Sequence, residues 1–192
     1  MTIRITRRDF LKGTGAALTS AAVPAGAANA QARVSDESGV RTITLEVNAT
    51  RRTVHVEPNA TLAEVLRGPL DLTGTKIGCD RGSCSACTVL LDRVPVLSCM
   101  LLAVDVGDRK ITTIEGLARG GELHPVQSAF VAHDAVQCGF CTPGIVLSCA
   151  ALLEGNPRPS PAEVRTAIGG HLCRCGTYPH VLAAMQDLAA KG

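Results

Sequence analysis

The sequence predicts an α+β fold in which a small domain of short strands comes first and an all-helical domain follows. Apolar residues alternate along residues 41–58, as expected for half-buried strands. From about residue 121 the apolar spacing becomes helical, and prolines begin successive helical segments. Glycine and charged residues gather at residues 115–122, so we place the boundary there, with domains at 41–118 and 119–190.

The first domain begins with two strands, 41–48 and 51–58, which form a hairpin around the short turn "NATR". Residues 61–68 follow as a short helix, because Thr61 and Glu64 have the spacing of a capping box. Further short strands are expected at 88–92, 94–101 and 109–114, with Asp92 and Arg93 at a turn.

The second domain is expected to contain four helices. They are predicted at residues 124–136, 142–155, 160–171 and 179–191. The third has the clearest start signal, since Ser160 can cap it, Pro161 suits the first helical position and Glu163 suits the third.

Composition limits the functional classes. The chain has 192 residues, of which 46% are hydrophobic, so it can form a packed core. Only 2% of the residues are aromatic. The net charge is +2, and no basic run is interleaved with aromatic residues. Nucleic-acid binding therefore has little support.

The N-terminus has the features of an export signal. Arg7 and Arg8 precede a weakly apolar stretch rich in Ala and Gly, and a small-x-small site ends at Ala30. This pattern resembles the bacterial twin-arginine signal, which would carry the folded protein to the periplasm. We expect a signal peptide at 1–30, a linker at 31–40 and no membrane span; a disordered tail is the alternative.

Four of the nine cysteines follow the spacing of plant-type [2Fe–2S] ferredoxins. They are Cys79, Cys84, Cys87 and Cys99. Small residues in the loop, including Gly78 and Gly82, would let backbone N–H groups approach anionic sulfurs. Structural zinc and disulfides are the alternatives.

A second set of four lies in the helical half, in C-x2-C and C-x-C motifs. It comprises Cys138, Cys141, Cys173 and Cys175. This spacing leaves an iron–sulfur cluster and zinc both open, and the neighbouring ferredoxin loop favours the cluster. Because a single residue separates Cys173 from Cys175, we expect these two thiolates on the same iron.

The remaining cysteine and the histidines are not expected to bind metal. Cys149 lies on an apolar helical face and is interpreted as a core residue. His171, two residues before Cys173, is expected to form hydrogen bonds near the second cluster.

Three motifs in series, "GCDRGSCSACTV", "QCGFCTPG" and "LCRCGTY", resemble the iron–sulfur subunit of the molybdenum hydroxylases, the xanthine dehydrogenase and aldehyde oxidase family. The resemblance covers residues 41–190. With the export signal, the nearest type is the small subunit of periplasmic aldehyde oxidoreductases. It implies a β-grasp, ferredoxin-like domain, then a four-helix domain, and two [2Fe–2S] clusters.

The resemblance also implies partners and a role. A large subunit would carry molybdopterin, with Cys175 in contact with the pterin and Gln137 bonded to the cofactor. Electrons from aldehyde oxidation would pass from molybdenum through the second and then the first cluster to an FAD subunit or a cytochrome. The alternatives are an N-heteroaromatic dehydrogenase, a free-standing periplasmic ferredoxin and a zinc-stabilised binding protein.

Two positions depart from the family pattern. Ser85 replaces the usual glycine after Cys84, and Ser would be strained if the position needs a positive φ. His171 stands where the family has asparagine. The first departure is expected to shift the reduction potential of the first cluster. The second is expected to change local contacts near the second cluster, not its ligands.

Overall fold

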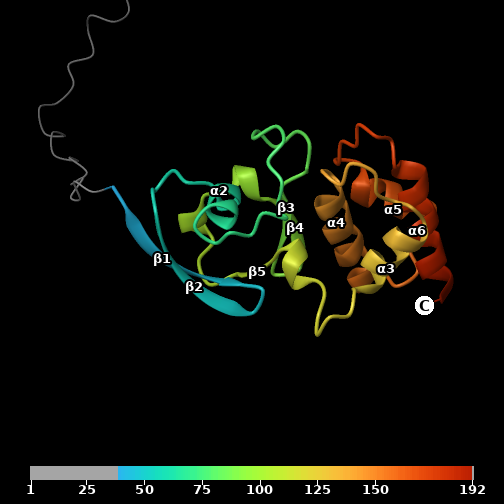
Figure 1. The fold of residues 1–192 in the computed structure, drawn as a ribbon, viewed down its shortest axis with the longest axis horizontal. Helices are drawn as coiled ribbons and strands as arrows, with labels where there is room; N and C mark the ends of the chain where they lie inside the picture. Colours follow the sequence, from blue (N-terminus) through green and yellow to red (C-terminus); the bar gives the residue numbers. More distant parts are fainter. Residues whose placement is uncertain (1–38, 192) are drawn as a thin grey trace, which may run out of the picture. The chain divides into compact units, whose positions relative to one another are not determined.

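The structure, a computed structural model, describes residues 39–191 (Figure 1). The predicted signal peptide and most of the linker lie outside these residues. The strands are β1 (Arg41–Val47), β2 (Thr50–Val56), β3 (Thr88–Leu91), β4 (Val94–Leu97) and β5 (Lys110–Thr112). The α-helices are α2 (Leu62–Arg67), α3 (Pro125–Ala132), α4 (Thr142–Gly155), α5 (Pro161–Ile168) and α6 (Tyr178–Lys191). The predicted order, strands before helices, is confirmed.

The strands form one five-stranded mixed sheet in the order β2-β1-β5-β3-β4. β1 runs parallel to β5, and the other neighbours are antiparallel. The β1–β2 turn has Asn48 and Ala49 at φ values of 52° and 61°, the left-handed pair that matches strand twist in a two-residue hairpin. Helix α2 buries Leu62 and Leu66 in the same core as Leu45 of β1. This arrangement is the β-grasp layout expected for the first domain.

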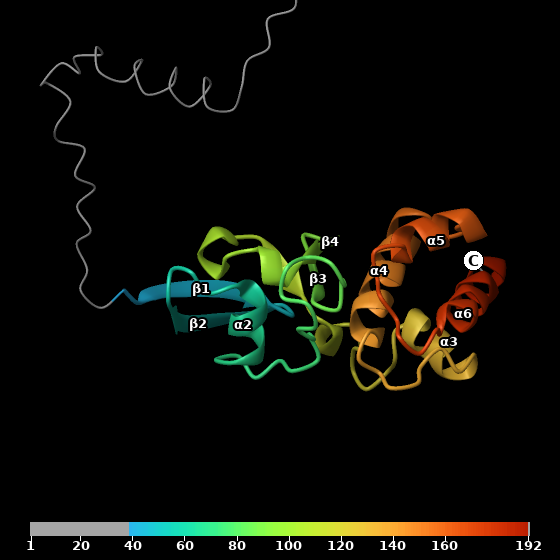
Figure 2. The ribbon, with the colours of Figure 1, turned by 90° about the horizontal axis from the view of Figure 1, so that it is seen from above.

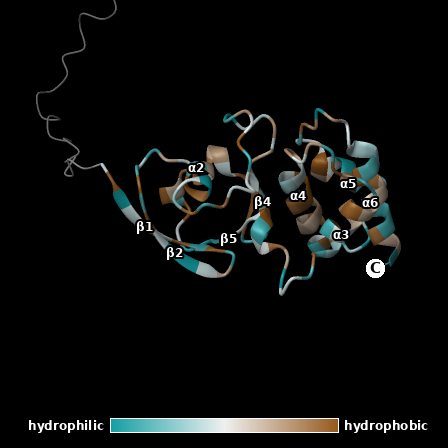
Figure 3. Ribbon diagram, in the orientation of Figure 1, coloured by the Kyte–Doolittle hydropathy of each residue, from teal (hydrophilic) through white to brown (hydrophobic). Residues whose placement is uncertain are grey.

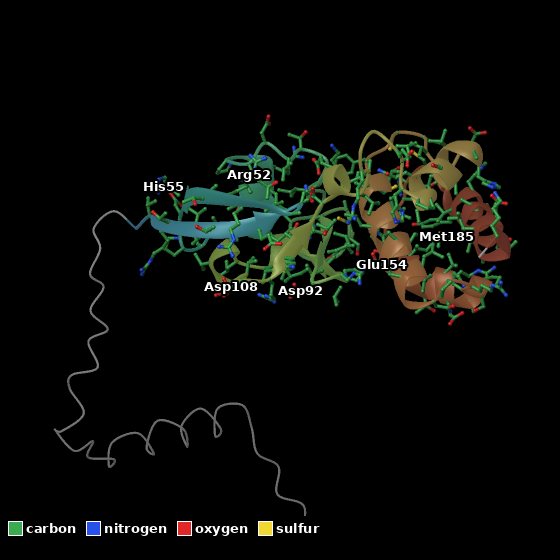
Figure 4. All side chains as sticks on the ribbon, turned by 90° about the horizontal axis from the view of Figure 1, so that it is seen from below. Arg52, His55, Asp92, Asp108, Glu154 and Met185 are labelled. Atoms are coloured by element: carbon green, nitrogen blue, oxygen red, sulfur yellow. The ribbon has the colours of Figure 1, made fainter. Side chains whose placement is uncertain are left out.

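The four longer helices enclose a second core. Phe130, Ile145, Val164, Val181 and Met185 are all buried there, and Figure 4 labels Met185 among the helices. Figure 3 shows hydrophobic residues along α4 and hydrophilic ones along the β1–β2 hairpin. The middle of α4, residues 144–150, is buried.

Helix α4 also joins the helical half to the sheet. It packs against β3 and β4, and Figure 2 shows it as the helix nearest to these strands. At one end of this contact, Arg93 Nε lies 3.0 Å from Glu154 Oε2. Both side chains are largely exposed, so the ion pair adds little stability compared with the apolar packing.

Some elements end earlier than the sequence predicts. The strand expected over 94–101 stops at Leu97, and Ser98–Met100 forms a short 3₁₀ helix. The Ser98 hydroxyl donates to the Cys87 carbonyl at 2.6 Å, which turns the chain out of the sheet. In the helical half, α3 ends at Ala132 and α5 at Ile168.

Among the helices of residues 39–191, none combines the length and the apolar character that crossing a bilayer requires.

Candidate iron–sulfur sites

The first cysteine loop, residues 79–87, connects α2 to β3 through a chain of tight turns. Asp80, Gly82 and Ser85 all lie in the left-handed region, at φ values of 53°, 74° and 56°. Such residues reverse the backbone and point consecutive N–H groups inward, a geometry that suits anionic sulfur. The positive φ of Ser85 explains why glycine is favoured at this position, and the strain expected for serine there is present.

The structure brings the first four thiols together as two pairs. The Cys79 thiol lies beside that of Cys84, and the Cys99 thiol lies beside that of Cys87. Cys99 is also close enough to interact electrostatically with Cys79. Ser98 fixes the second pair, because its N–H and its hydroxyl both donate to the Cys87 carbonyl, at 3.3 and 2.6 Å.

Two thiols of this site, Cys79 and Cys99, differ in their pKa. Backbone N–H of Arg81, with help from the Cys84 thiol, lowers the pKa of Cys79 to about 7. The Ser83 N–H also donates to its sulfur, at 3.2 Å. Burial raises the pKa of Cys99 to about 11. Of these two ligands, Cys99 is therefore the one from which a bound metal must displace the proton more strongly.

The second site lies at the N-terminal end of α4. Cys138 is exposed in the loop before the helix, and Cys141 is the buried residue that precedes its first turn. The Cys138 thiol lies beside that of Cys175, and the Cys141 thiol lies beside that of Cys173. Each thiol of the C-x-C motif therefore lies beside a thiol of the C-x2-C motif, and the binding of Cys173 and Cys175 to the same iron stays a prediction.

Two residues outside the predicted set hold Cys173 in place. The Thr177 N–H and hydroxyl lie 3.4 and 3.2 Å from its sulfur. Burial raises the pKa of Cys173, but these hydrogen bonds, together with the Cys141 thiol and the Gly176 N–H, outweigh it and lower the pKa to about 7. The Tyr178 hydroxyl accepts from the Cys173 N–H at 2.8 Å and donates to the His171 carbonyl at 2.7 Å.

Sequence reasoning missed Thr177 and Tyr178. The available signal was that the only tyrosine of the chain directly follows the last cysteine motif. Cys149, in contrast, lies where it was expected: it is fully buried among apolar residues of the helical core, and burial raises its pKa to about 12.

The donor sets fit two-iron clusters. The thiols lie as two pairs at each site, and a [2Fe–2S] cluster takes two protein ligands per iron. A mononuclear zinc site needs four ligands around one point. The pairs and the N–H groups directed at sulfur therefore favour the iron–sulfur interpretation.

The two sites meet through a short backbone contact. The N–H of Leu172, next to Cys173, donates to the carbonyl of Cys84 at 3.1 Å. His171 is buried in the same place, and its Nε2 lies 2.8 Å from the Ser148 hydroxyl on α4. His171 was expected to form hydrogen bonds near the second cluster; its carbonyl is linked to Cys173 through Tyr178, and its ring lies between α4 and the first cysteine loop.

The electrostatics of His171 follow from this position. Burial lowers its pKa to about 4, opposed by the nearby Ser85 backbone. Its Nδ1 has no hydrogen-bond partner of ordinary geometry, although it is directed towards that backbone. The ring is therefore neutral at pH 7. Gln137, which with Cys175 was expected to contact the molybdopterin, is exposed next to Cys138.

Comparisons with known proteins give two iron–sulfur domains in the same order along the chain. Residues 45–112 match the 2Fe-2S iron-sulfur cluster binding domain, and residues 113–186 match the [2Fe-2S] binding domain. The iron-sulfur-binding subunit PaoA of an aldehyde oxidoreductase from Escherichia coli K12 is 37% identical over 206 aligned positions, which cover 98% of this chain and 90% of that subunit. The chain is an iron–sulfur subunit of the molybdenum hydroxylase family.

Other members of the family are similar at comparable levels. The small subunit of nicotine 6-hydroxylase from Paenarthrobacter nicotinovorans is 48% identical over 145 residues, covering 76% of this chain and 87% of that subunit. The crystal structure of quinoline 2-oxidoreductase from Pseudomonas putida 86 superposes with a TM-score of 0.73 at 41% identity, covering 80% of this chain and 98% of the matched chain. These iron–sulfur subunits belong to enzymes with different substrates, so the fold alone does not select one.

Proposed function

We propose that this chain is the electron-transfer subunit of an exported molybdenum enzyme that oxidises aldehydes to carboxylic acids. The observation that carries the proposal is the similarity to PaoA over 98% of the chain, together with two sites of four thiols each. The similarity to the nicotine 6-hydroxylase subunit covers a smaller share, 76%. When bound, each [2Fe–2S] cluster accepts and releases one electron at a time.

The residues around the sulfurs would set the charge that each site tolerates. The Ser83 N–H at Cys79 and the Thr177 N–H and hydroxyl at Cys173 favour the thiolate forms. Ser98 and Tyr178 do not contact the sulfurs; they form hydrogen bonds with the backbone of Cys87 and Cys173. These groups keep the ligands in position without rearrangement when the charge of the site changes.

Gln137 and Cys175 are the residues we assign to the molybdopterin side. Gln137 is exposed beside the exposed Cys138, and Cys138 is the thiol that contacts Cys175. A large molybdenum-binding subunit would approach this edge of the second site. An FAD subunit or a cytochrome would accept electrons on the side of the first site.

Export by the twin-arginine route is part of the same proposal. Arg7 and Arg8, followed by a weakly apolar stretch, support it, and that route transports proteins already folded with their cofactors. The expected location is therefore the periplasm.

A second candidate substrate class is the N-heteroaromatic compounds. The 48% identity with the nicotine 6-hydroxylase subunit, higher than the 37% with PaoA, favours it. The substrate pocket belongs to the large subunit, so activity of the whole complex must decide between the two classes.

The deciding experiment is to purify the native complex and measure its metals and its substrates. We expect about four irons and four sulfides per small chain, and molybdenum in a co-purified large chain. Dye reduction should be supported by aromatic and aliphatic aldehydes and not by nicotinate. Activity with nicotinate alone would assign the second substrate class, and zinc without iron would contradict both.

Two cysteine variants test the assignment of the cluster ligands, one at a ligand and one at a core residue as its control. Cys99→Ser should remove the EPR signal of the first cluster and about half of the iron, because one of its four ligands is lost. Cys149→Ala should retain both signals, because Cys149 is a buried core residue. If Cys149→Ala lost a cluster while Cys99→Ser kept both, the assignment of ligands would be wrong.

A further inference from the structure

His171 is buried between α4 and the first cysteine loop, and its ring takes no part in binding the thiols. The residue is 4% exposed. Its Nε2 lies 2.8 Å from the hydroxyl of Ser148, which is also buried. Its Nδ1 has no partner of ordinary geometry and is directed towards the Ser85 backbone. Because an unpaired polar atom away from water is costly, this second nitrogen indicates which residue the ring supports.

The ring and the Ser85 carbonyl meet at one point beside α4. A Cβ on Gly144 would lie 2.6 Å from the Ser85 carbonyl oxygen, and 3.2 and 3.3 Å from Cε1 and Nδ1 of His171. The absence of a side chain at Gly144 therefore lets the ring and the carbonyl come together. An imidazole suits this place because it has two nitrogens, one for the Ser148 hydroxyl and one for the carbonyl.

The residues on both sides of His171 contact the same turn. A Cβ on Gly170 would lie 3.1 Å from the Ser85 hydroxyl oxygen, so the Ser85 side chain faces this glycine. The N–H of Leu172 donates to the Cys84 carbonyl at 3.1 Å. Three successive residues of the segment 170–172 therefore support the turn at Cys84 and Ser85.

Ser85 needs this support because its φ of 56° lies in the left-handed region. A residue other than glycine keeps such a conformation only where the surrounding structure fixes it. Thr88 holds the Ser85 carbonyl from the side of β3, and His171 faces it from the side of α4. Ser85 and His171 are also the two positions at which the sequence departs from the family pattern. The contact between them makes the two departures one structural feature.

We propose that His171 is a positioning residue for the first cluster, although it precedes a ligand of the second. Its ring, held by Ser148, keeps the turn at Ser85 closed, and this turn holds Cys84 and the loop whose N–H groups are directed at sulfur. Such N–H groups stabilise the more negative, reduced form of a cluster, so their position sets its reduction potential. The inference rests on the two clusters of the proposed function and not on its substrate.

The test is a double-mutant cycle of Ser85→Gly and His171→Asn in the iron-loaded chain, followed by redox titration with EPR detection. His171→Asn alone should lower the equilibrium constant for reduction of the first cluster about threefold or more, which is about 28 mV for a one-electron couple. The second cluster should shift less, although its ligand Cys173 is only two residues away. In the Ser85→Gly background the turn needs no support, so His171→Asn should shift the first cluster less than half as much.

Thermal unfolding of the same four proteins gives a second readout. His171→Asn should lower the Tm by about 2–4 °C in the wild-type background and by less in the Ser85→Gly background. His180→Asn is the matched control, because His180 is exposed on α6 and its Nδ1 lies 3.0 Å from the His133 carbonyl. It should leave both potentials and the Tm at their wild-type values.

Ser148→Ala provides an independent variant, because it removes the group that holds Nε2 of His171. It should shift the first cluster in the same direction as His171→Asn and by a smaller amount. If His171→Asn loses the first cluster altogether, adding Ser85→Gly should restore its iron and its EPR signal.

Three results would overturn the proposal: equal shifts of the first cluster in both backgrounds, a shift confined to the second cluster, or a lost first cluster that Ser85→Gly does not restore. A wild-type chain that holds zinc and no iron would contradict the proposed function instead. The cycle of Tm values would then still test the contact between Ser85 and His171.

Discussion

Ser85 shows how one residue links the cysteine loop to the rest of the chain. Its φ of 56° places it in the left-handed region. Its carbonyl accepts from the N–H of Thr88 at 3.2 Å and from the Thr88 hydroxyl at 2.8 Å. These bonds close the turn between Cys84 and Cys87, so the strain is held by the start of β3. The family preference for glycine predicted the conformation, and the contacts that maintain it appear only in the fold.

Ser85→Gly should therefore stabilise the iron-loaded chain. Relief of left-handed strain, of about 1–3 kcal/mol, should exceed the added flexibility of glycine in the unfolded chain, of about 0.4–1 kcal/mol. Thermal unfolding at a fixed scan rate should show a rise in Tm of about 2–4 °C. Ser83→Gly is the control in the same loop, and it should lower Tm because Ser83 has no positive φ. A rise in both variants would show that the loop, not residue 85, is strained.

Helix starts are the elements that local sequence predicts best. Ser160 accepts from the Glu163 N–H at 3.3 Å, and Glu163 accepts from the Ser160 N–H at 2.7 Å. The same reciprocal arrangement joins Thr61 and Glu64 at α2. These groups lie three residues apart, so their geometry follows from the helix itself. Helix ends were predicted less well: α3 stops before Asp134, whose φ is 51°, and α5 stops at Gly169 and Gly170.

Ser160→Ala tests the cap of α5. We expect a loss of about 1 kcal/mol of stability, because the Glu163 N–H loses its acceptor at the N-terminus. Thr166→Ala in the same helix is the control; its hydroxyl donates to the Ala162 carbonyl at 3.0 Å, so its removal should be close to neutral. Thermal unfolding and iron retention would be measured for both. Equal losses would mean that the cap contributes nothing specific.

At Gly144, α4 comes close to the first cysteine loop. A Cβ at this position would lie 2.6 Å from the Ser85 carbonyl oxygen and 3.2 Å from the His171 ring. Only glycine permits this approach. This close approach and the Leu172–Cys84 hydrogen bond together hold the two thiol sites in place relative to each other. The segments that they join are far apart in the sequence.

Gly144→Ala should consequently disturb the contact between the two halves of the described chain. We expect a loss of about 1–3 kcal/mol from overpacking and a weaker magnetic interaction between the two reduced clusters in low-temperature EPR. Gly155→Ala, at the other end of α4, is the control, because a Cβ there meets nothing within 4 Å. It should be neutral or slightly stabilising. An unchanged interaction in Gly144→Ala would show that this contact does not set the spacing.

The sequence by itself determined which side chains take part. Cysteine spacing separated eight thiols into two sets and left Cys149 for the core, and caps and alternation located the strands and the helix starts. Only the tertiary structure decided how the thiols pair and that His171 lies between the sites. The reason is physical: caps and strand patterns depend on neighbours in sequence, whereas pairing and burial depend on packing between distant segments.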